Sequence, residues 1–259
     1  MGFEKISVVI RFHDAGQIKR LDKCLYSLLP SIELIEIILV LQRFNKQELE
    51  VVTALLSKLN ISNYKLLNVE DESPVDLRTR LLNVGLKSVD TKLVHFLDYD
   101  DVMLPQGYSI ISEKCISDNY SSGIYFFRVA RAFYNIYGDH DFLTCIDSPY
   151  KGGSIAELIK DNFCPIHSYV YNADRLAVNN LLFDEAYTRL EDYDLLLRTI
   201  ALENANFGDV DNIVGLYNFR NDFSNTTLLD NNNETIVTDE WMKSRLRIAE
   251  VKRRLFNII

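Results

Sequence analysis

The feature that most constrains the fold is an alternation, along the first part of the chain, between short apolar runs and longer segments with helical periodicity. The runs are rich in β-branched residues, and each is followed by a stretch whose apolar positions recur every three or four residues. Because parallel strands need a crossover connection, usually a helix, this pattern predicts an α/β fold with a Rossmann-like, mostly parallel sheet flanked by helices. The predicted strands are residues 6–10, 34–41, 64–69 and 92–97, and the predicted helices are residues 18–29, 46–59 and 74–89.

The second half of the chain carries weaker patterns. They predict strands at residues 123–136 and 168–172 and helices at residues 154–161 and 191–204. Residues 221–235 are rich in Asn, Asp and Thr, which is typical of a loop or linker. We therefore expect one α/β domain over residues 1–225, followed by a linker and a C-terminal amphipathic helix over residues 226–259.

The predicted C-terminal helix is basic as well as amphipathic. Trp241, Ile248 and Leu255 recur every seven residues, which places them on one side of a helix. Six basic residues accompany them: Lys243, Arg245, Arg247, Lys252, Arg253 and Arg254. Two interpretations stay open, because such a helix either packs on its own domain or on a second copy of the chain, or attaches to an anionic membrane surface.

Composition limits the partners and the compartment. The chain has 259 residues, 47% of them hydrophobic, so it can bury a full core without disulfides. Its four cysteines have no C-x-x-C spacing and no apolar run is long enough to span a membrane. We therefore expect a cytoplasmic protein, either free or peripheral at the inner face of the membrane. A net charge of −9 argues against a nucleic-acid partner, since phosphate binding requires basic surface.

The segment LVHFLDYDD, residues 93–101, ends a predicted buried strand in three carboxylates. Asp98, Asp100 and Asp101 would repel one another unless a cation lay among them. Parallel sheets bind ligands outside the carboxyl ends of their strands, which is where these aspartates are expected. Carboxylates favour a hard divalent ion, Mg²⁺ or Mn²⁺, held together with substrate phosphates. The alternative is a solvated turn in which Asp101 caps the following helix.

A second carboxylate group, LEDYDLLLR at residues 190–198, opens a predicted helix. Glu191 and Asp194 lie three positions apart on one side of that helix, and Asp192 lies near its start, where backbone N–H groups are unpaired. A helix start that faces a cleft can hold one carboxylate as a general base. The alternative is a structural segment with helix capping and an Asp194–Arg198 ion pair.

The order of these segments resembles that of family 2 glycosyltransferases with the GT-A fold. ISVVIRFHDAG, RTRLLNVGLKSVDTKLVHFLDYDDVMLP and FDEAYTRLEDYDLLLRTIA are similar to the family's nucleotide-binding, DXD and ED segments. GLYNFRNDFSNTT is similar to the Tyr-x-Tyr-Arg-x-His segment that often follows. The resemblance covers roughly residues 5–226, and the ordered set carries it rather than any single motif.

The resemblance implies an inverting, metal-dependent enzyme that moves a sugar from a nucleotide-sugar donor to a saccharide or lipid-linked acceptor hydroxyl in surface polysaccharide biosynthesis. Asp98 and Asp100 match the DXD pair, so they are expected to hold Mn²⁺ or Mg²⁺ on the donor diphosphate, with Asp98 near the ribose. Asp192 matches the base of the ED motif. Glu191 is expected to orient Asp192 or to contact the acceptor.

Several positions depart from the family's pattern. The residues Arg11 to Asp14 replace Pro-x-Tyr-Asn after the first strand, and Gln42 stands where an acidic contact to the base is usual. The usual arginine before Gly85 is a leucine here, which leaves two arginines upstream as candidate partners of the diphosphate. The expected donor-binding residues are therefore His13, Asp14, Gln42, Arg78, Arg80 and Asp98. Asp222 replaces an expected histidine and is a further candidate metal ligand.

Two other functions stay open. A nucleotidyltransferase also combines an α/β sheet with a metal-binding acidic pair, but IRFHDAGQIKR is a poor match to the glycine-rich, basic phosphate loop expected after its first strand. A non-catalytic relative of the GT-A fold, acting as a sugar- or nucleotide-binding module, is consistent with the departures at Arg11, Leu41 and Asp222. Retention of both acidic segments favours the enzyme.

Overall fold

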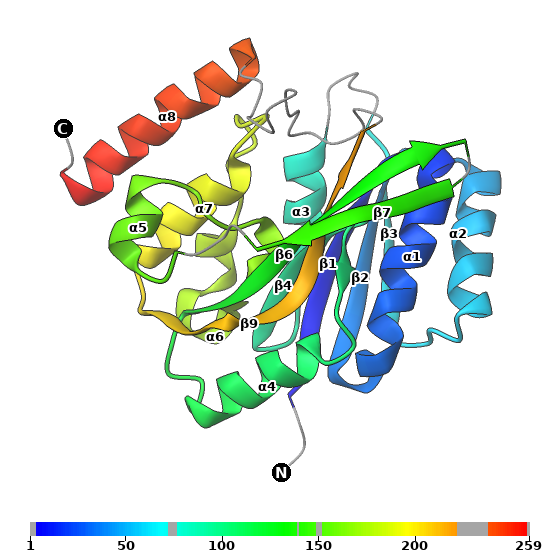
Figure 1. The fold of residues 1–259 in the computed structure, drawn as a ribbon, viewed down its shortest axis with the longest axis horizontal. Helices are drawn as coiled ribbons and strands as arrows, with labels where there is room; N and C mark the ends of the chain where they lie inside the picture. Colours follow the sequence, from blue (N-terminus) through cyan, green and yellow to red (C-terminus); the bar gives the residue numbers. More distant parts are fainter. Residues whose placement is uncertain (1–3, 72–76, 139, 149–151, 222–237, 258–259) are drawn as a thin grey trace.

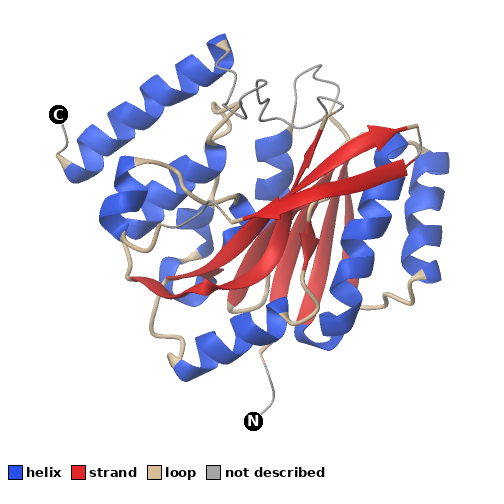
Figure 2. Cartoon of the chain, in the orientation of Figure 1, coloured by secondary structure: helices blue, strands red, loops and turns tan. Residues whose placement is uncertain are grey.

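The computed structural model describes residues 4–71, 77–138, 140–148, 152–221 and 238–257. Its centre is a nine-stranded mixed sheet in the order β3-β2-β1-β4-β8-β6-β9-β5, with β7 pairing to β6 outside this path. Helices cover both faces of the sheet, as Figure 1 and Figure 2 show. The predicted α/β architecture is therefore confirmed.

The first four long strands form a parallel half of the sheet. They are β1 (Ile6–Phe12), β2 (Ile35–Gln42), β3 (Tyr64–Val69) and β4 (Leu93–Asp98). β1 lies between β2 and β4 and pairs with both in unbroken register. β1, β2 and β4 are almost entirely buried, so they read as near-continuous apolar runs, whereas β3 at the edge of the sheet is only half-buried. The sequence pattern located all four.

The helices between these strands also follow the prediction. They are α1 (Ile18–Leu28), α2 (Lys46–Lys58) and α3 (Arg78–Leu86), with short 3₁₀ segments at Ala15–Gln17 and Leu29–Leu34. Asn45 and Glu48 form a capping box, which starts α2 soon after β2 ends. α3 ends at Leu86 rather than at residue 89, because the amides of Ser88 and Val89 bond three residues back and tighten the chain into turns. It begins at Arg78, and residues 74–76 of the predicted helix lie outside the described residues.

The second half mixes antiparallel and parallel pairing. Its strands are β5 (Val102–Met103), β6 (Ile124–Tyr137), β7 (His140–Asp147), β8 (Tyr169–Asn172) and β9 (Ala205–Arg220). Its helices are α4 (Gly107–Ser117), α5 (Ile155–Lys160), α6 (Ala173–Leu176), α7 (Glu191–Ile200) and α8 (Asp239–Phe256), with 3₁₀ turns at Ile166–Ser168 and Val178–Leu181. The sequence analysis missed α4, α6, β5, β7 and β9. α7 also ends at Ile200, before residue 204.

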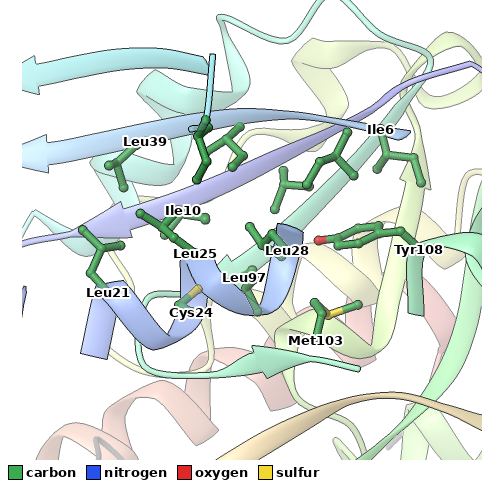
Figure 3. Packing of buried hydrophobic residues seen from close by; sticks show 14 of the residues in the cluster. Ile6, Ile10, Leu21, Cys24, Leu25, Leu28, Leu39, Leu97, Met103 and Tyr108 are labelled. Carbon is green, nitrogen blue, oxygen red and sulfur yellow. The ribbon is translucent and has the colours of Figure 1, made fainter. Parts of the chain in front are cut away.

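The core forms two layers, one on each face of the sheet, because successive residues of a strand point to opposite faces. Val8 and Ile10 pack with α1, α2 and α4 in one layer, whereas Val9 packs with α3 and α7 in the other. Figure 3 shows the first layer, in which Leu21 and Leu25 of α1 lie against the strands.

One glycine sets the spacing between α3 and the sheet. A β-carbon at Gly85 would lie 2.4 Å from Val9 Cγ1 and 3.0 Å from Val40 Cγ2. Real side chains do not tolerate the shorter distance, so only glycine lets α3 pack this closely on β1 and β2. The contact fixes α3 beside the strand edge at which the acidic segments meet.

The C-terminal helix α8 packs along α7 (Figure 1). Ile248 and Val251 are buried there, and the cations of Arg247 and Lys252 lie over tyrosine rings at 5.6 and 5.0 Å from the ring centres. The predicted helix therefore exists and rests on its own domain. None of the helices in the described ranges combines the length and apolarity that crossing a membrane requires.

Candidate active site

The two acidic segments meet at the carboxyl edge of the parallel strands, and an arginine lies between them. Arg11 is two residues beyond Val9 on β1, so its side chain points to the same sheet face, toward α3 and α7. Asp98 ends β4 as the register partner of Arg11. Arg11 Nε donates to Asp98 Oδ1 at 2.9 Å, and Nη2 donates to Oδ2 at 3.4 Å.

The same guanidinium reaches the second acidic segment. Arg11 Nη1 donates to Glu191 Oε1 at 3.0 Å, and the side chains of Arg11 and Glu191 are only 13% and 7% exposed. Burial alone would lower the pKa of Arg11, but the charges of Asp98 and Glu191 outweigh it and raise that pKa. Burial likewise opposes ionisation of Asp98, yet the adjacent Arg11 lowers its pKa overall. Arg11 and Asp98 are therefore both charged at neutral pH.

Hydrogen bonds from other elements fix the approach to α7. The Asn83 side chain in α3 donates to the Phe183 carbonyl at 3.0 Å and accepts from the Phe183 amide at 2.8 Å. Arg198 donates to the Leu182 carbonyl and pairs with Asp194 at 2.8 Å, as predicted for the Asp194–Arg198 pair. These hydrogen bonds hold the chain just before α7 and the helix itself, so they fix where its first turn begins.

The first turn of α7 is entered through a strained residue. Leu190, at the N-cap, has φ 62° and ψ 22°, in the left-handed region that non-glycine residues seldom adopt, and its side chain caps nothing. Such conformations persist where surrounding contacts hold them, and they cluster at functional sites. The turn presents Glu191 and Asp192 side by side at the strand edge.

Asp192 has the titration expected of a general base. Burial and the neighbouring charge of Glu191 raise its pKa to about 7, although the Tyr193 amide and Arg11 pull it down. Its Oδ1 accepts from the Tyr193 amide at 2.8 Å, which orients the carboxylate. A carboxyl group whose pKa lies near neutrality exchanges protons readily under physiological conditions.

A second arginine holds the turn after β4. Arg220, at the end of β9, donates to Asp100 Oδ2 at 2.9 Å and to the Asp100 carbonyl at 2.7 Å. The Asn218 amide donates to Asp101 Oδ1 at 2.8 Å. The alternative in which Asp101 caps the next helix is therefore wrong. α4 begins at Gly107 without a side-chain cap, and Asp101 is buried beneath β9 instead.

Asp101 lies in a buried polar layer under the site. Its Oδ2 accepts no hydrogen bond from the described residues and lies 3.5 Å from His167 Nδ1. Burial lowers the pKa of His167 to about 4, so this imidazole is neutral at pH 7. Burial and the charges of Asp100 and Asp98 raise the pKa of Asp101. The layer therefore disfavours further negative charge at this turn.

Metal binding by these residues needs a partner molecule. Among the residues that the structure describes, no group of three or more His, Cys, Asp or Glu side chains is placed to hold an ion. Both oxygens of Asp98 accept from Arg11, and Asp100 Oδ2 accepts from Arg220. Mg²⁺ is commonly held by one or two carboxylates together with substrate phosphates. The donor set therefore fits a divalent ion only when a diphosphate completes it.

The predicted donor-binding residues lie around the same edge, but not all face it. The exposed His13 ring makes an edge contact with Tyr99 at 5.5 Å, and Asp14 accepts from the Gly16 amide at the start of a 3₁₀ turn. Gln42 ends β2, and its buried Oε1 accepts no hydrogen bond from the described part of the chain. Of these three residues, Gln42 is the one with a buried polar atom left for a bound ligand to pair with.

The two candidate arginines of α3 differ in their surroundings. Burial raises the pKa of Asp98, and Arg78 lies close enough to be among the groups that lower it, although Arg11 lowers it more. Arg80 is exposed and pairs with Asp71 after β3. Arg78 is therefore nearer than Arg80 to the acidic turn, which carries Asp98, Asp100 and Asp101. Asp222, the further candidate metal ligand, lies outside the described residues.

Comparisons with known proteins identify the fold. No family model and no curated protein matches the sequence. The structure of S. aureus TarS 1–349 in complex with UDP-GlcNAc matches with a TM-score of 0.64 and 17% identity, covering 97% of this chain and 67% of that one. Mannosyltransferase PcManGT from Pyrobaculum calidifontis, in complex with GDP-Man and Mn²⁺, matches with a TM-score of 0.55 and 11% identity, covering 84% of this chain and 57% of that one.

The match extends over only part of the longer proteins. The chain spans 60% of TarS 1–349 and 36% of the longer TarS structure, at 18% and 19% identity with TM-scores of 0.59 and 0.60. The similar structures are GT-A-type glycosyltransferases, which confirms the GT-A fold that the order of the motifs implies. With its mostly parallel sheet, flanking helices and C-terminal helix, this chain has the GT-A glycosyltransferase fold.

Proposed function

We propose that this protein is an inverting glycosyltransferase that moves a sugar from a nucleotide-sugar donor to an acceptor hydroxyl. One observation carries the proposal: Asp98 of the DXD pair and Glu191, which directly precedes Asp192, are far apart in the sequence and both bind the guanidinium of Arg11 at the strand edge. Ligands bind at that edge in α/β sheets. The complexes of similar structures with UDP-GlcNAc and with GDP-Man support a nucleotide-sugar donor.

In this proposal Asp192 is the general base. It takes the proton from the acceptor hydroxyl as that oxygen forms a bond to the anomeric carbon on the face opposite the leaving group. The bond between the anomeric carbon and the diphosphate oxygen breaks, and its electron pair leaves with the nucleoside diphosphate. Glu191 accepts a hydrogen bond from Arg11 and orients the turn that carries Asp192.

The donor would lie over the ends of β1, β2 and β4. Asp98 would face the ribose and Asp100 the diphosphate. Gln42 would meet the base and Arg78 the phosphates, with His13, Asp14 and Arg80 at the rim. A divalent ion, Mn²⁺ or Mg²⁺, bound by Asp100 with Asp98 or Asp222, would stabilise negative charge on the departing diphosphate. The Mn²⁺ complex of the mannosyltransferase supports this ion.

The acceptor is proposed as a chemical class and the location as a compartment. We infer a saccharide or lipid-linked acceptor in surface polysaccharide biosynthesis, and a cytoplasmic protein that is free or peripheral at the membrane. The exposed side chains of Met242 and Leu246 on the basic helix α8 support contact with a membrane or with a second copy.

A second candidate function has a specific observation in its favour. Arg11 and Arg220 already pair with Asp98 and Asp100, so the acidic turn is neutralised without any ion. A non-catalytic GT-A protein that binds nucleotides or sugars would tolerate this arrangement. Such a protein would bind a donor without turning it over.

A donor panel with two variants separates the two candidates. Nucleoside diphosphates and nucleotide sugars are screened by thermal shift with and without Mn²⁺, since a ligand of the native state raises the melting temperature. We expect Asp100→Ala to lose the Mn²⁺-dependent shift, and Asp192→Asn to keep it while losing transfer to an acceptor by about 100-fold or more. Asp211→Asn, at a surface carboxylate, is the control. Full transfer by Asp192→Asn would refute the base assignment.

The pH profile gives an independent check. Because the pKa of Asp192 is raised to about 7 and only its ionised form accepts a proton, kcat/KM should fall about tenfold per pH unit below pH 7. The measurement is kcat/KM between pH 5 and about 9 with the donor found in the panel. A rate that stays constant down to pH 5 would rule out this carboxylate as the base.

A further inference from the structure

Arg11 joins two elements that must keep a fixed relation if the proposed chemistry is to occur. One edge of its guanidinium, Nε and Nη2, faces both oxygens of Asp98 at the end of β4. The opposite nitrogen, Nη1, faces Glu191 at the first residue of α7. A single side chain of β1 therefore ties the donor side of the site to the helix that carries the base.

The contact matters because it links the first residue of α7 to β1, whereas the Tyr193 hydroxyl in the same turn donates to the Leu158 carbonyl of α5. The N-cap residue Leu190 offers no side-chain cap and lies in a strained conformation. The hydrogen bonds of Asn83 and Arg198 fix the chain before this turn and the helix after it. The Tyr187 side chain also hydrogen-bonds Asp194 in this turn, but Glu191 is the residue that joins the turn to the guanidinium of β1, and Asp192 follows Glu191 directly.

An arginine can perform this bridging and a lysine cannot. The guanidinium is planar and presents donors in a fixed fork, so it binds one carboxylate with two nitrogens while a third nitrogen binds another. A lysine ammonium at the same place would keep the charge but not the geometry. The bridge therefore depends on the shape of the cation as well as on its sign.

We propose that Arg11 is a positioning residue, which fixes the first turn of α7 and the base Asp192 on it relative to Asp98 and the donor. This inference rests on the proposed function and deepens it. A displacement of about 1 Å at such a site can cost on the order of 100-fold in rate, because reaction requires the attacking and accepting groups to be aligned. Arg11 would act through Glu191 and Asp98 without touching the reacting atoms.

The charge environment of Asp192 provides a specific readout. Three charged groups influence it: Glu191 on its own helix, Arg11 on β1 and Asp98 on β4. Three further titratable groups face it, namely Cys164 before β8 and Tyr169 and Tyr171 on β8, and burial raises the pKa of each, so they stay neutral. Arg11 lowers the pKa of Asp192 and Glu191 raises it. Removing the two charges should therefore shift the acid limb of the rate profile in opposite directions.

The experiment compares kcat, donor KM and the pH profile for three variants of the full chain. Arg11→Lys should lower kcat at least about tenfold with little change in donor KM, because the charge remains and the alignment is lost. Arg11→Met should move the acid limb to higher pH, and Glu191→Gln should move it to lower pH. Arg175→Met, which breaks a surface pair with Glu203, is the matched control and should change neither.

Two results would overturn the inference. Arg11→Lys with the kcat of the unaltered chain would show that the fork is not needed. A loss of kcat by the same factor at every pH, with an unmoved acid limb, would show that Arg11 only supports folding. If Arg11→Met does not fold, Arg11→Lys and Glu191→Gln still provide both tests.

A measurement without turnover separates this inference from the proposed function. Carbon-13 NMR of labelled aspartate carboxyls follows the ionisation of Asp192 in the unaltered chain and in each variant. If the unaltered chain transfers no sugar, the proposed function fails, whereas opposite shifts of Asp192 in Arg11→Met and Glu191→Gln would still support the bridge. If the chain transfers sugar but Asp192 titrates alike in all variants, the bridge fails and the function stands.

Discussion

The two halves of the sheet are built by different rules. In the parallel half, β1, β2, β3 and β4 are joined by α1, α2 and α3, and each connection is a single crossover. In the other half, β6 pairs with β7, β8 and β9, and its register with β9 shifts at several points. Local sequence patterns are enough to specify the first arrangement, whereas the second depends on pairing between distant segments.

The candidate site lies where the halves meet, and buried charges join them. Arg11 in the parallel half pairs with Glu191 in the other, and Asp100 after β4 pairs with Arg220 at the end of β9. The exposed pair of Arg175 with Glu203, by contrast, lies within the second half. Site geometry should therefore be sensitive to changes at the junction and tolerant of changes elsewhere.

The largest effect is expected from removing Arg220, whose pair with Asp100 belongs to the junction between the two halves of the sheet. Arg220→Met removes one partner of a pair whose side chains are 4% and 19% exposed, and it leaves Asp100 beside Asp98 and Asp101 with less compensation. Removing one member of a buried pair costs about 3 to 5 kcal/mol, because the other charge stays desolvated. Urea denaturation should show this loss in the free energy of unfolding.

The control for this prediction is the exposed pair. Arg175→Met should cost about 0 to 1 kcal/mol, since solvent screens surface pairs. Equal costs for the two variants would mean that the junction contributes no more stability than the surface does. The contrast between the halves and their junction would then have no energetic basis.

The parallel half was predictable because its signals are local. The apolar runs of β1, β2, β3 and β4 and the capping residues before α2 lie next to the elements they specify. The second half carries weaker signals, which located β6, β8, α5 and α7 but not β7 or β9. β7 has as many polar or charged residues as apolar ones, and most of it is exposed. β9 contains Asp209, Asp211 and Asn212. Those residues suit a strand only because β6 and the loops around it supply pairing partners.

The acidic residues of the site were found from sequence, and the arginines between them were not. Asp98, Asp100, Glu191 and Asp192 occupy recognisable segments, and the structure brings both segments to one edge. Arg11 was noted only as a replacement for proline. The two-residue alternation of β1 places it on the face of Val9, which was a usable signal. No local pattern predicts that Arg220 reaches Asp100.

An intermediate effect is expected within the parallel half at Gly85. Gly85→Ala places a β-carbon 2.4 Å from Val9 Cγ1, so α3 must move away from β1. Overpacking of this kind costs about 1 to 3 kcal/mol in the free energy of unfolding. Because α3 also carries Asn83 and Arg78, donor affinity should fall as well. Gly153→Ala, where the nearest atom is 3.6 Å away, is the control and should be nearly neutral.

The smallest effect is expected at Asn45, a local signal far from the junction. Asn45 caps α2 by accepting from the amides of Gln47 and Glu48, and Glu48 accepts from the Asn45 amide in return. Asn45→Ala should cost about 1 kcal/mol in the free energy of unfolding and leave kcat and donor KM unchanged, because the cap holds only its own helix. Asn45→Gly should cost only a few tenths of that amount. A change in kcat in either variant would mean that α2 is coupled to the site, and that the parallel half does more than support the strand edge on which Arg11 and Asp98 meet.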